Sequence, residues 1–152
     1  MLHKGYPQIL TFTIGTFYSS IDKLREYRRL ALQQFLLDCP SGIKENRYIK
    51  AELPKLPFED KSFDLVLSGH FLFTYSHKLD FSFILSSILE LYRVSSKEVR
   101  IYPLQQSSLQ PYEQMTELLF ALEKLKIKYD IVTVPFEFQR GSNKMLLLRC
   151  MS

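Results

Sequence analysis

The stretch "LPFEDKSFDLVLSGHFLFTY" (residues 56–75) decides the fold. It opens with a charged turn, because proline and aspartate favour tight turns. The segment "SFDLVLSGHF" (residues 62–71) then has the composition of a strand, with an apolar core at residues 65–67. Such a near-continuous apolar run predicts a strand that is covered on both faces, as in parallel sheets. A histidine, His70, stands where this strand is expected to end.

The rest of the chain alternates expected strands with expected helices. Strands are predicted at residues 8–18, 47–53, 62–71 and 98–104, and helices at residues 19–38, 80–94 and 110–127. Pro40 and Gly42 are expected to end the first helix. Residues 128–150 predict a hairpin around a Gly-Ser-Asn turn. This order predicts an α/β fold with a mostly parallel sheet and a C-terminal antiparallel hairpin.

A ligand site is expected where the most apolar strand ends. In open α/β sheets, ligands bind in the crevice beyond the carboxyl ends of the strands. This rule places Ser68, Gly69 and His70 at the site. Gly69 would allow a ligand to approach the backbone closely, and His70 is a candidate catalytic base because an imidazole titrates near neutral pH.

Composition limits the classes of function. The 152 residues fit one domain spanning residues 1–152, with 46% hydrophobic and 24% charged residues, as in ordinary globular proteins. The formal charge of +4 is small. The basic residues of the first helix are not interleaved with stacking aromatics, so nucleic-acid binding is not expected, and an RNA-binding protein that uses this helix is only a third, weaker hypothesis. These residues are Lys23, Arg25, Arg28 and Arg29.

The two cysteines and the hydropathy pattern bear on metals and location. Cys39 and Cys150 lie far apart and fit no metal-ligand spacing, so no metal site is expected. Reduced thiols in a cytoplasmic protein are the default interpretation. No run approaches the roughly 20 apolar residues of a membrane span, and residues 9–20 lack the cleavage site of a secretory leader.

Three motifs together resemble a known family. The opening stretch, the helix end "ELYRV" (residues 90–94) and the strand "EVRIYPL" (residues 98–104) resemble class I methyltransferases that use S-adenosylmethionine. In that family a Leu-Pro-Phe turn, a Ser-Phe-Asp strand start and a Glu-x-x-Arg-Val helix end recur in this order. The likeness spans residues 48–150 and leaves residues 1–47 as a divergent N-terminal strand and helix. It implies a Rossmann-like sheet and methyl transfer to an acceptor that no sequence feature identifies.

The resemblance also assigns cofactor contacts. Glu52 stands where the family places an acidic residue that accepts a hydrogen bond from the adenine amino group, and Leu53 would pack on the adenine ring. Ser68, Gly69 and His70 occupy the strand end that faces the methionine portion of S-adenosylmethionine. A solvated loop carboxylate is the alternative interpretation of Glu52, and a packed or surface histidine is the alternative for His70.

Other charged residues of the motifs are expected to be structural. Asp60 belongs to the turn, and Asp64 matches the strand-start aspartate of the family. Arg93 and Arg100 match positive positions of the family motif and are expected to anchor neighbouring segments.

The family's main cofactor loop is not found in this sequence. That loop is rich in glycine, because a Cβ atom would block close approach of the backbone to the cofactor. The five glycines stand at positions 5, 15, 42, 69 and 141, and no two are close enough to form it. The chain is therefore expected to be a truncated or degenerate member, which lacks the central first strand and is inactive or binds the cofactor weakly on its own.

A missing central strand predicts an unpaired sheet edge. Self-association, or a partner chain, would complete the sheet and satisfy its backbone groups. A second hypothesis is therefore a non-catalytic protein-interaction module built on the methyltransferase scaffold.

Overall fold

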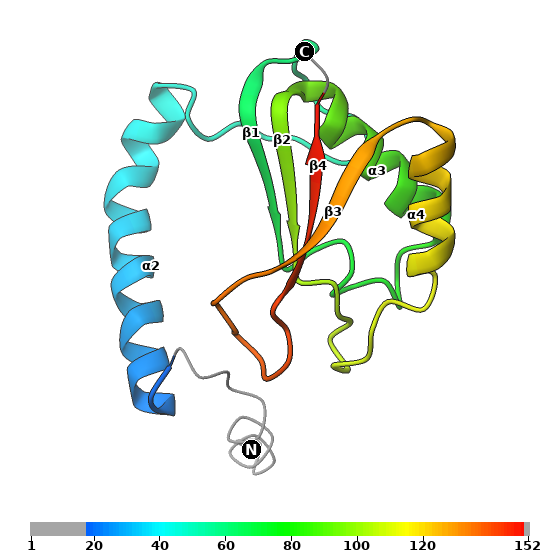
Figure 1. Ribbon diagram of the computed structural model, residues 1–152. Coiled ribbons are helices and arrows are strands. Elements are labelled where there is room, and N and C mark those ends of the chain that lie inside the picture. The colour runs from blue at the N-terminus through cyan, green and yellow to red at the C-terminus, as the bar shows by residue number, and fades with distance from the viewer. Residues whose placement is uncertain (1–17, 151–152) are drawn as a thin grey trace. The chain divides into compact units, whose positions relative to one another are not determined.

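The computed structural model describes residues 18–150, which belong to two compact units (Figure 1). The first unit contains residues up to Ala51 together with Phe136–Arg140, and the second contains Glu52–Pro135 and the segment from Gly141 onward. Each unit has its own internal contacts. The expected strand at residues 8–18 lies outside the described residues except for its last position, and the single domain over residues 1–152 stays a prediction.

Helix α2 (Ile21–Lys44) dominates the first unit and is longer than expected. Ser20 caps its start, as the sequence predicts for a helix that begins there. The expected end at Pro40 is wrong, because the helix continues through this residue. A proline removes one backbone donor, and here the carbonyl that loses its helical partner belongs to Leu36, a residue that is 60% exposed. The helix instead ends before Asn46, whose positive φ of 55° turns the chain out of the helical path.

The expected strand at residues 47–53 is also wrong. Arg47 donates two hydrogen bonds of 2.7 Å to the Asp38 carboxylate, and the Tyr48 hydroxyl donates a third of 2.7 Å. These bonds fold the segment back against the end of α2, where no described strand pairs with it. They also lower the pKa of Asp38 to about 2, chiefly through Arg47.

The second unit contains a four-stranded sheet with the order β1-β2-β4-β3. The strands are β1 (Phe63–Gly69), β2 (Ser95–Tyr102), β3 (Lys128–Thr133) and β4 (Lys144–Arg149). β1 runs parallel to β2, and β4 runs antiparallel to both β2 and β3. β4 alone therefore opposes the other three strands. This arrangement confirms the expected α/β class and the C-terminal antiparallel pair, within a mixed sheet in which only β1 and β2 among the described strands pair in parallel.

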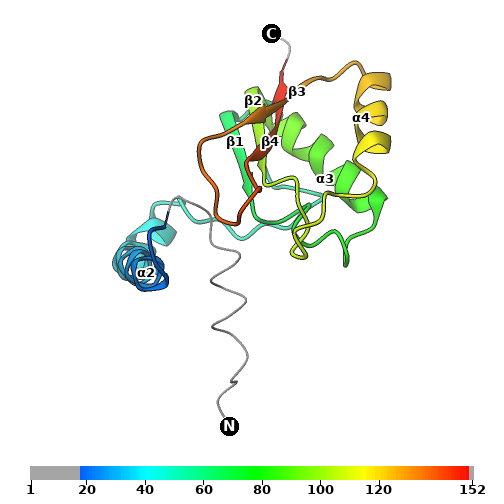
Figure 2. The same cartoon turned by 60° about the horizontal axis from the view of Figure 1, so that its bottom comes forward.

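Two helices lie on the same face of this sheet (Figures 1 and 2). α3 (Phe81–Val94) is capped by Asp80, which accepts a 2.7 Å hydrogen bond from the Phe83 amide. α4 (Met115–Lys124) begins later than the predicted residue 110. The reason is that Pro111 forms a β-bridge with Gln105, which holds this part of the chain in a turn.

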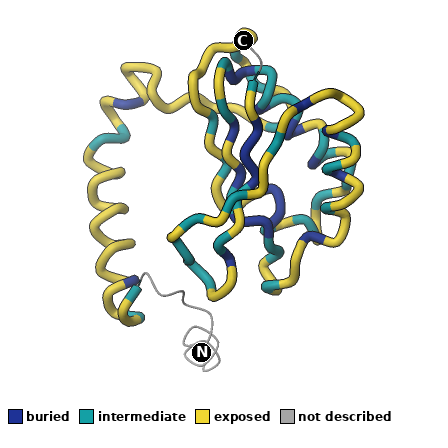
Figure 3. Tube along the Cα trace, viewed as in Figure 1, coloured by how far each residue is buried: buried dark blue, intermediate teal, exposed yellow. Residues whose placement is uncertain are grey.

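The core fills the space between the sheet and these two helices (Figure 3). Its most buried members are Leu72, Phe73, Ile84, Ile88, Val99, Ile101, Leu118, Leu122, Leu146 and Leu148. Within the second unit, only one face of β1 is covered, and not both faces as expected. Val66 packs against the core, whereas its neighbours Leu65 and Leu67 are 44% and 68% exposed. Side chains alternate along a strand, and α3 and α4 cover one face.

Candidate functional site at the carboxyl edge of the parallel strands

The turn that precedes β1 is held by an arginine at the end of α3. Arg93 donates hydrogen bonds to the Asp60 carboxylate at 2.7 Å, to the Phe58 carbonyl at 2.9 Å and to the Glu90 carboxylate at 2.8 Å. Glu90 in turn accepts a 2.6 Å hydrogen bond from the Leu56 amide. The two sequence motifs, the charged turn and the Glu-x-x-Arg-Val helix end, are therefore one structural unit. Arg93 is confirmed as an anchor and Asp60 as a turn residue.

The Glu90 carboxylate predicts a specific pH dependence of stability. Hydrogen bonds from Arg93 lower its pKa from 4.5 to about 2, and the Leu56 amide adds to this effect. A carboxylate with a lowered pKa in the folded state stabilises the fold above about pH 4.5, and this contribution is lost as the pH falls toward about 2. We expect the difference in free energy of unfolding between the natural chain and Glu90→Gln to shrink over this range. Urea titrations at a series of pH values measure it, and a difference that does not change with pH would contradict the assignment.

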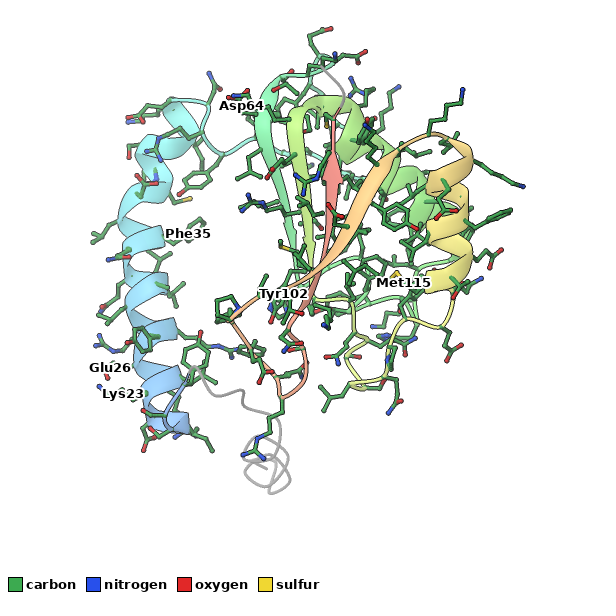
Figure 4. The ribbon with its side chains drawn as sticks, in the orientation of Figure 1. Lys23, Glu26, Phe35, Asp64, Tyr102 and Met115 are labelled. Carbon is green, nitrogen blue, oxygen red and sulfur yellow. The ribbon has the colours of Figure 1, made fainter. Side chains whose placement is uncertain are left out.

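The candidate site lies where β1 and β2 end. β1 ends at Gly69, and the next residue, His70, has a positive φ of 52°. The His70 amide donates a 2.7 Å hydrogen bond to the Tyr102 carbonyl, and the two rings meet edge to face with their centroids 5.4 Å apart. Tyr102 ends β2, and it lies at the opposite edge of the sheet from Asp64, which stands near the start of β1 (Figure 4). The predicted residues Ser68, Gly69 and His70 are thus joined to the end of the neighbouring parallel strand.

A polar cluster that the sequence did not single out adjoins this strand end. The Tyr102 hydroxyl donates to the Ser142 carbonyl, and the Gln105 side-chain amide donates to the Gly141 carbonyl at 3.1 Å. These bonds connect the end of β2 and the chain just after it to the chain before β4. The Oγ1 of Thr74 and the Oε1 of Gln105 are buried without a partner among the described residues. A buried polar atom requires a hydrogen-bond partner, so each of these two atoms suits a bound polar group or water.

Tyr102 could have been found by the rule that located His70. It stands at the carboxyl end of an expected strand, directly before Pro103. Its hydroxyl contact depends on a partner far along the chain, which local patterns do not reveal.

The residues at the strand end leave room for a ligand. A Cβ atom added to Gly69 would meet no atom within 4 Å, so the backbone is approachable there. The contact of Ser68, Gly69 and His70 with the methionine portion of S-adenosylmethionine stays a prediction. Glu52 is exposed and forms an isolated bridge with Lys55, and Leu53 packs against the core. The adenine contacts assigned to these two residues stay predictions.

Asp64 and Arg100 differ in their structural roles. Asp64 accepts hydrogen bonds from Lys97 at 2.7 Å and from the Ser96 hydroxyl at 2.8 Å, so it links the starts of β1 and β2 as expected. Arg100 bonds to Glu98, two residues earlier on the same strand. It joins no second segment of the described chain, so the expectation that it acts as an anchor is wrong.

Several basic side chains of α2 are engaged locally. Lys23 pairs with Glu26 at 2.9 Å, Arg25 pairs with Asp22 at 3.2 Å, and the Arg28 guanidinium lies over the Phe138 ring. The two carboxylates offset the positive charge of Lys23 and Arg25, whereas Arg28 keeps its full charge.

The described residues show neither a metal cluster nor a membrane-spanning helix. Across residues 18–150, no group of three or more His, Cys, Asp or Glu side chains is arranged to hold a metal ion. In the same part of the chain, no helix has the length and apolar character needed to cross a membrane.

A family model described as a methyltransferase domain matches residues 24–101. The chain therefore belongs to the methyltransferase-domain family. The match begins within α2, earlier than residue 48, where the sequence resemblance was placed. An uncharacterised protein of Methanocaldococcus jannaschii is 31% identical over 134 residues, which cover 87% of this chain and 56% of that protein. The chain thus spans little more than half the length of this curated relative.

A solved structure was also found by comparison. The crystal structure of a SAM-dependent methyltransferase from Aquifex aeolicus matches 66% of this chain and 52% of its own, with 20% identity and a TM-score of 0.39. A score of this size does not establish a shared fold, so the family assignment rests on the matched sequence model.

Proposed function

We propose that this protein takes part in methyl transfer from S-adenosylmethionine to an unidentified acceptor. The observation that carries the proposal is the convergence of Ser68, Gly69 and His70 with Tyr102 at the carboxyl edge of two parallel strands. Ligands of open α/β sheets bind at this edge, and the chain belongs to the methyltransferase-domain family. When bound, S-adenosylmethionine supplies an activated methyl group on a sulfonium ion.

In this proposal the protein residues chiefly position the reactants. Displacement at a methyl group requires alignment of the acceptor with that group in a dry site. Gly69 lets the cofactor approach the backbone, and Ser68 offers a hydrogen-bonding hydroxyl beside it. His70 takes up a proton from the acceptor at a ring nitrogen, with its backbone fixed by the bond to Tyr102.

We further propose that this chain alone binds the cofactor weakly. None of its glycines lie close enough together to form the glycine-rich loop of the family. The predicted adenine contacts are limited to an exposed carboxylate and a leucine that packs on the core. The chain alone would then be inactive, unless a further polypeptide segment completes the cofactor site.

Chemical-shift mapping tests the location of the site even if binding is weak. We expect titration with S-adenosylhomocysteine to shift the amide signals of Ser68, Gly69, His70 and Tyr102. Gly69→Leu fills the open space at the strand end and should abolish these shifts. Shifts confined to other residues, or no shifts up to the solubility limit of the ligand, would contradict the proposed site.

A matched variant controls for the added side chain. Thr116→Leu places the same leucine on the exposed surface of α4 and should leave the shifts unchanged. If Gly69→Leu and Thr116→Leu behave alike, the strand end is not the binding site.

The second candidate function is a protein-interaction module without catalysis. The outer edge of β1 favours it, because β1 pairs with β2 and with no other described strand. Loss of every cofactor response in the titration above would leave this candidate as the better account.

We propose a cytoplasmic location because neither cysteine forms a disulfide. Cys39 and Cys150 are both free thiols, which is the usual state in a reducing compartment.

A further inference from the structure

Among residues 18–150, no strand pairs with the outer edge of β1, and this edge is apolar. Such an edge presents a row of backbone donors and acceptors, and proteins commonly protect it with charged side chains. On one face of β1 the side chains of Phe63, Leu65 and Leu67 are 40%, 44% and 68% exposed. Asp64 is the one charged residue in the strand, and it lies at the second position. The middle and the end of this edge therefore carry no charge that would oppose strand pairing.

We infer that a second copy of this chain pairs with this edge, antiparallel about a two-fold axis that passes through Val66. β1 has seven residues, and Val66 is its central one, so this register pairs the whole strand with itself. Leu65 then lies opposite Leu67 of the second copy on the exposed face. On the other face Asp64 of each copy lies opposite Ser68 of the other copy.

The charges on the strand favour a second copy as the occupant. In this register no like charges meet, because Asp64 faces a hydroxyl and keeps its own 2.7 Å contact with Lys97. The apolar residues meet each other, because Leu65 faces Leu67 twice. An isologous interface requires a surface that is complementary to itself, and β1 meets this requirement in both charge and hydrophobicity.

The size of the contact predicts a reversible dimer. One pair of short strands buries less than the roughly 1,200–2,000 Å² of a stable protein–protein interface. We therefore expect monomers at low concentration and dimers at high concentration, as seen by sedimentation velocity or light scattering across a dilution series. A chain that stays monomeric throughout the series would overturn the inference.

A charge exchange tests the register directly. Leu65→Lys/Leu67→Lys puts lysine opposite lysine at both symmetric pairs and should abolish the dimer, and Leu65→Glu/Leu67→Glu should do the same with carboxylates. An equimolar mixture of the two variants puts lysine opposite glutamate and should restore a heterodimer. Both positions are exposed, so the variants should keep the natural circular dichroism spectrum.

The control places the same charges elsewhere in the second unit. Phe120→Lys/Leu125→Lys changes two exposed apolar residues in and just after α4 and should leave dimer formation unchanged. If the Leu65→Lys/Leu67→Lys variant dimerises as well as the natural chain, the interface lies elsewhere. Failure of the mixed variants to associate, when each remains folded, would contradict the proposed register.

Discussion

Replacement of Phe73 by alanine is expected to lower the free energy of unfolding by about 3–5 kcal/mol, which is typical of a buried phenylalanine. Its side chain is 1% exposed, and its ring lies 5.2 Å from that of Tyr112. The ring fastens the segment that follows the candidate site to the core, and alanine would leave a cavity there. Urea unfolding followed by circular dichroism measures the loss.

Phe120→Ala is the matched control for this effect. Phe120 is 56% exposed on α4, and the Lys124 ammonium lies 4.4 Å from its ring centroid. The same change in composition should cost less than about 1 kcal/mol here, because little apolar surface leaves the core. Equal losses for Phe73→Ala and Phe120→Ala would show that the segment after β1 is not packed as described.

Replacement of Arg93 by alanine should lower the melting temperature by roughly 5–10 °C. The change removes the hydrogen bonds to Asp60 and Phe58 and leaves the Glu90 carboxylate without its cation. Glu90 is largely covered, with 12% of its side chain exposed, and an uncompensated charge there is costly. Differential scanning calorimetry above pH 6 measures the change.

Arg100→Ala is the control, because it removes an arginine that holds no turn. Its partner Glu98 lies on the same exposed face of β2, and exposed ion pairs contribute little to stability. A fall in melting temperature for Arg100→Ala as large as that for Arg93→Ala would contradict the role of Arg93 as the clamp of the turn.

The elements that sequence predicted well are those whose signals are local. The stretch at residues 56–75 combines turn residues with an apolar run, and it forms a turn and a strand. Asp80 begins a helix whose apolar side chains recur on one side, and α3 follows it closely. The C-terminal hairpin was predicted from two β-rich segments around Gly141, and β3 and β4 do pair antiparallel.

The features that sequence missed depend on contacts with distant residues or with solvent. A proline inside a helix usually ends it, but the helix can continue where water satisfies the carbonyl that loses its partner. The helix continues through Pro40. Residues 47–53 have strand composition, yet Arg47 bonds to Asp38 and no described strand pairs with this segment. The apolar run of β1 predicted cover on both faces, but periodicity cannot show which neighbours are present. The link from Tyr102 to Ser142 likewise joins segments whose proximity arises only from the fold.

Calorimetric titration of this chain with S-adenosylmethionine or S-adenosylhomocysteine tests the central claim most directly. The claim is that the chain holds the carboxyl edge of a methyltransferase site without the glycine-rich loop required for tight binding. We predict little or no heat at micromolar concentrations of ligand, because the contacts at Ser68, Gly69 and His70 are too few to bind it tightly. A clear 1:1 isotherm with a micromolar dissociation constant would contradict this account.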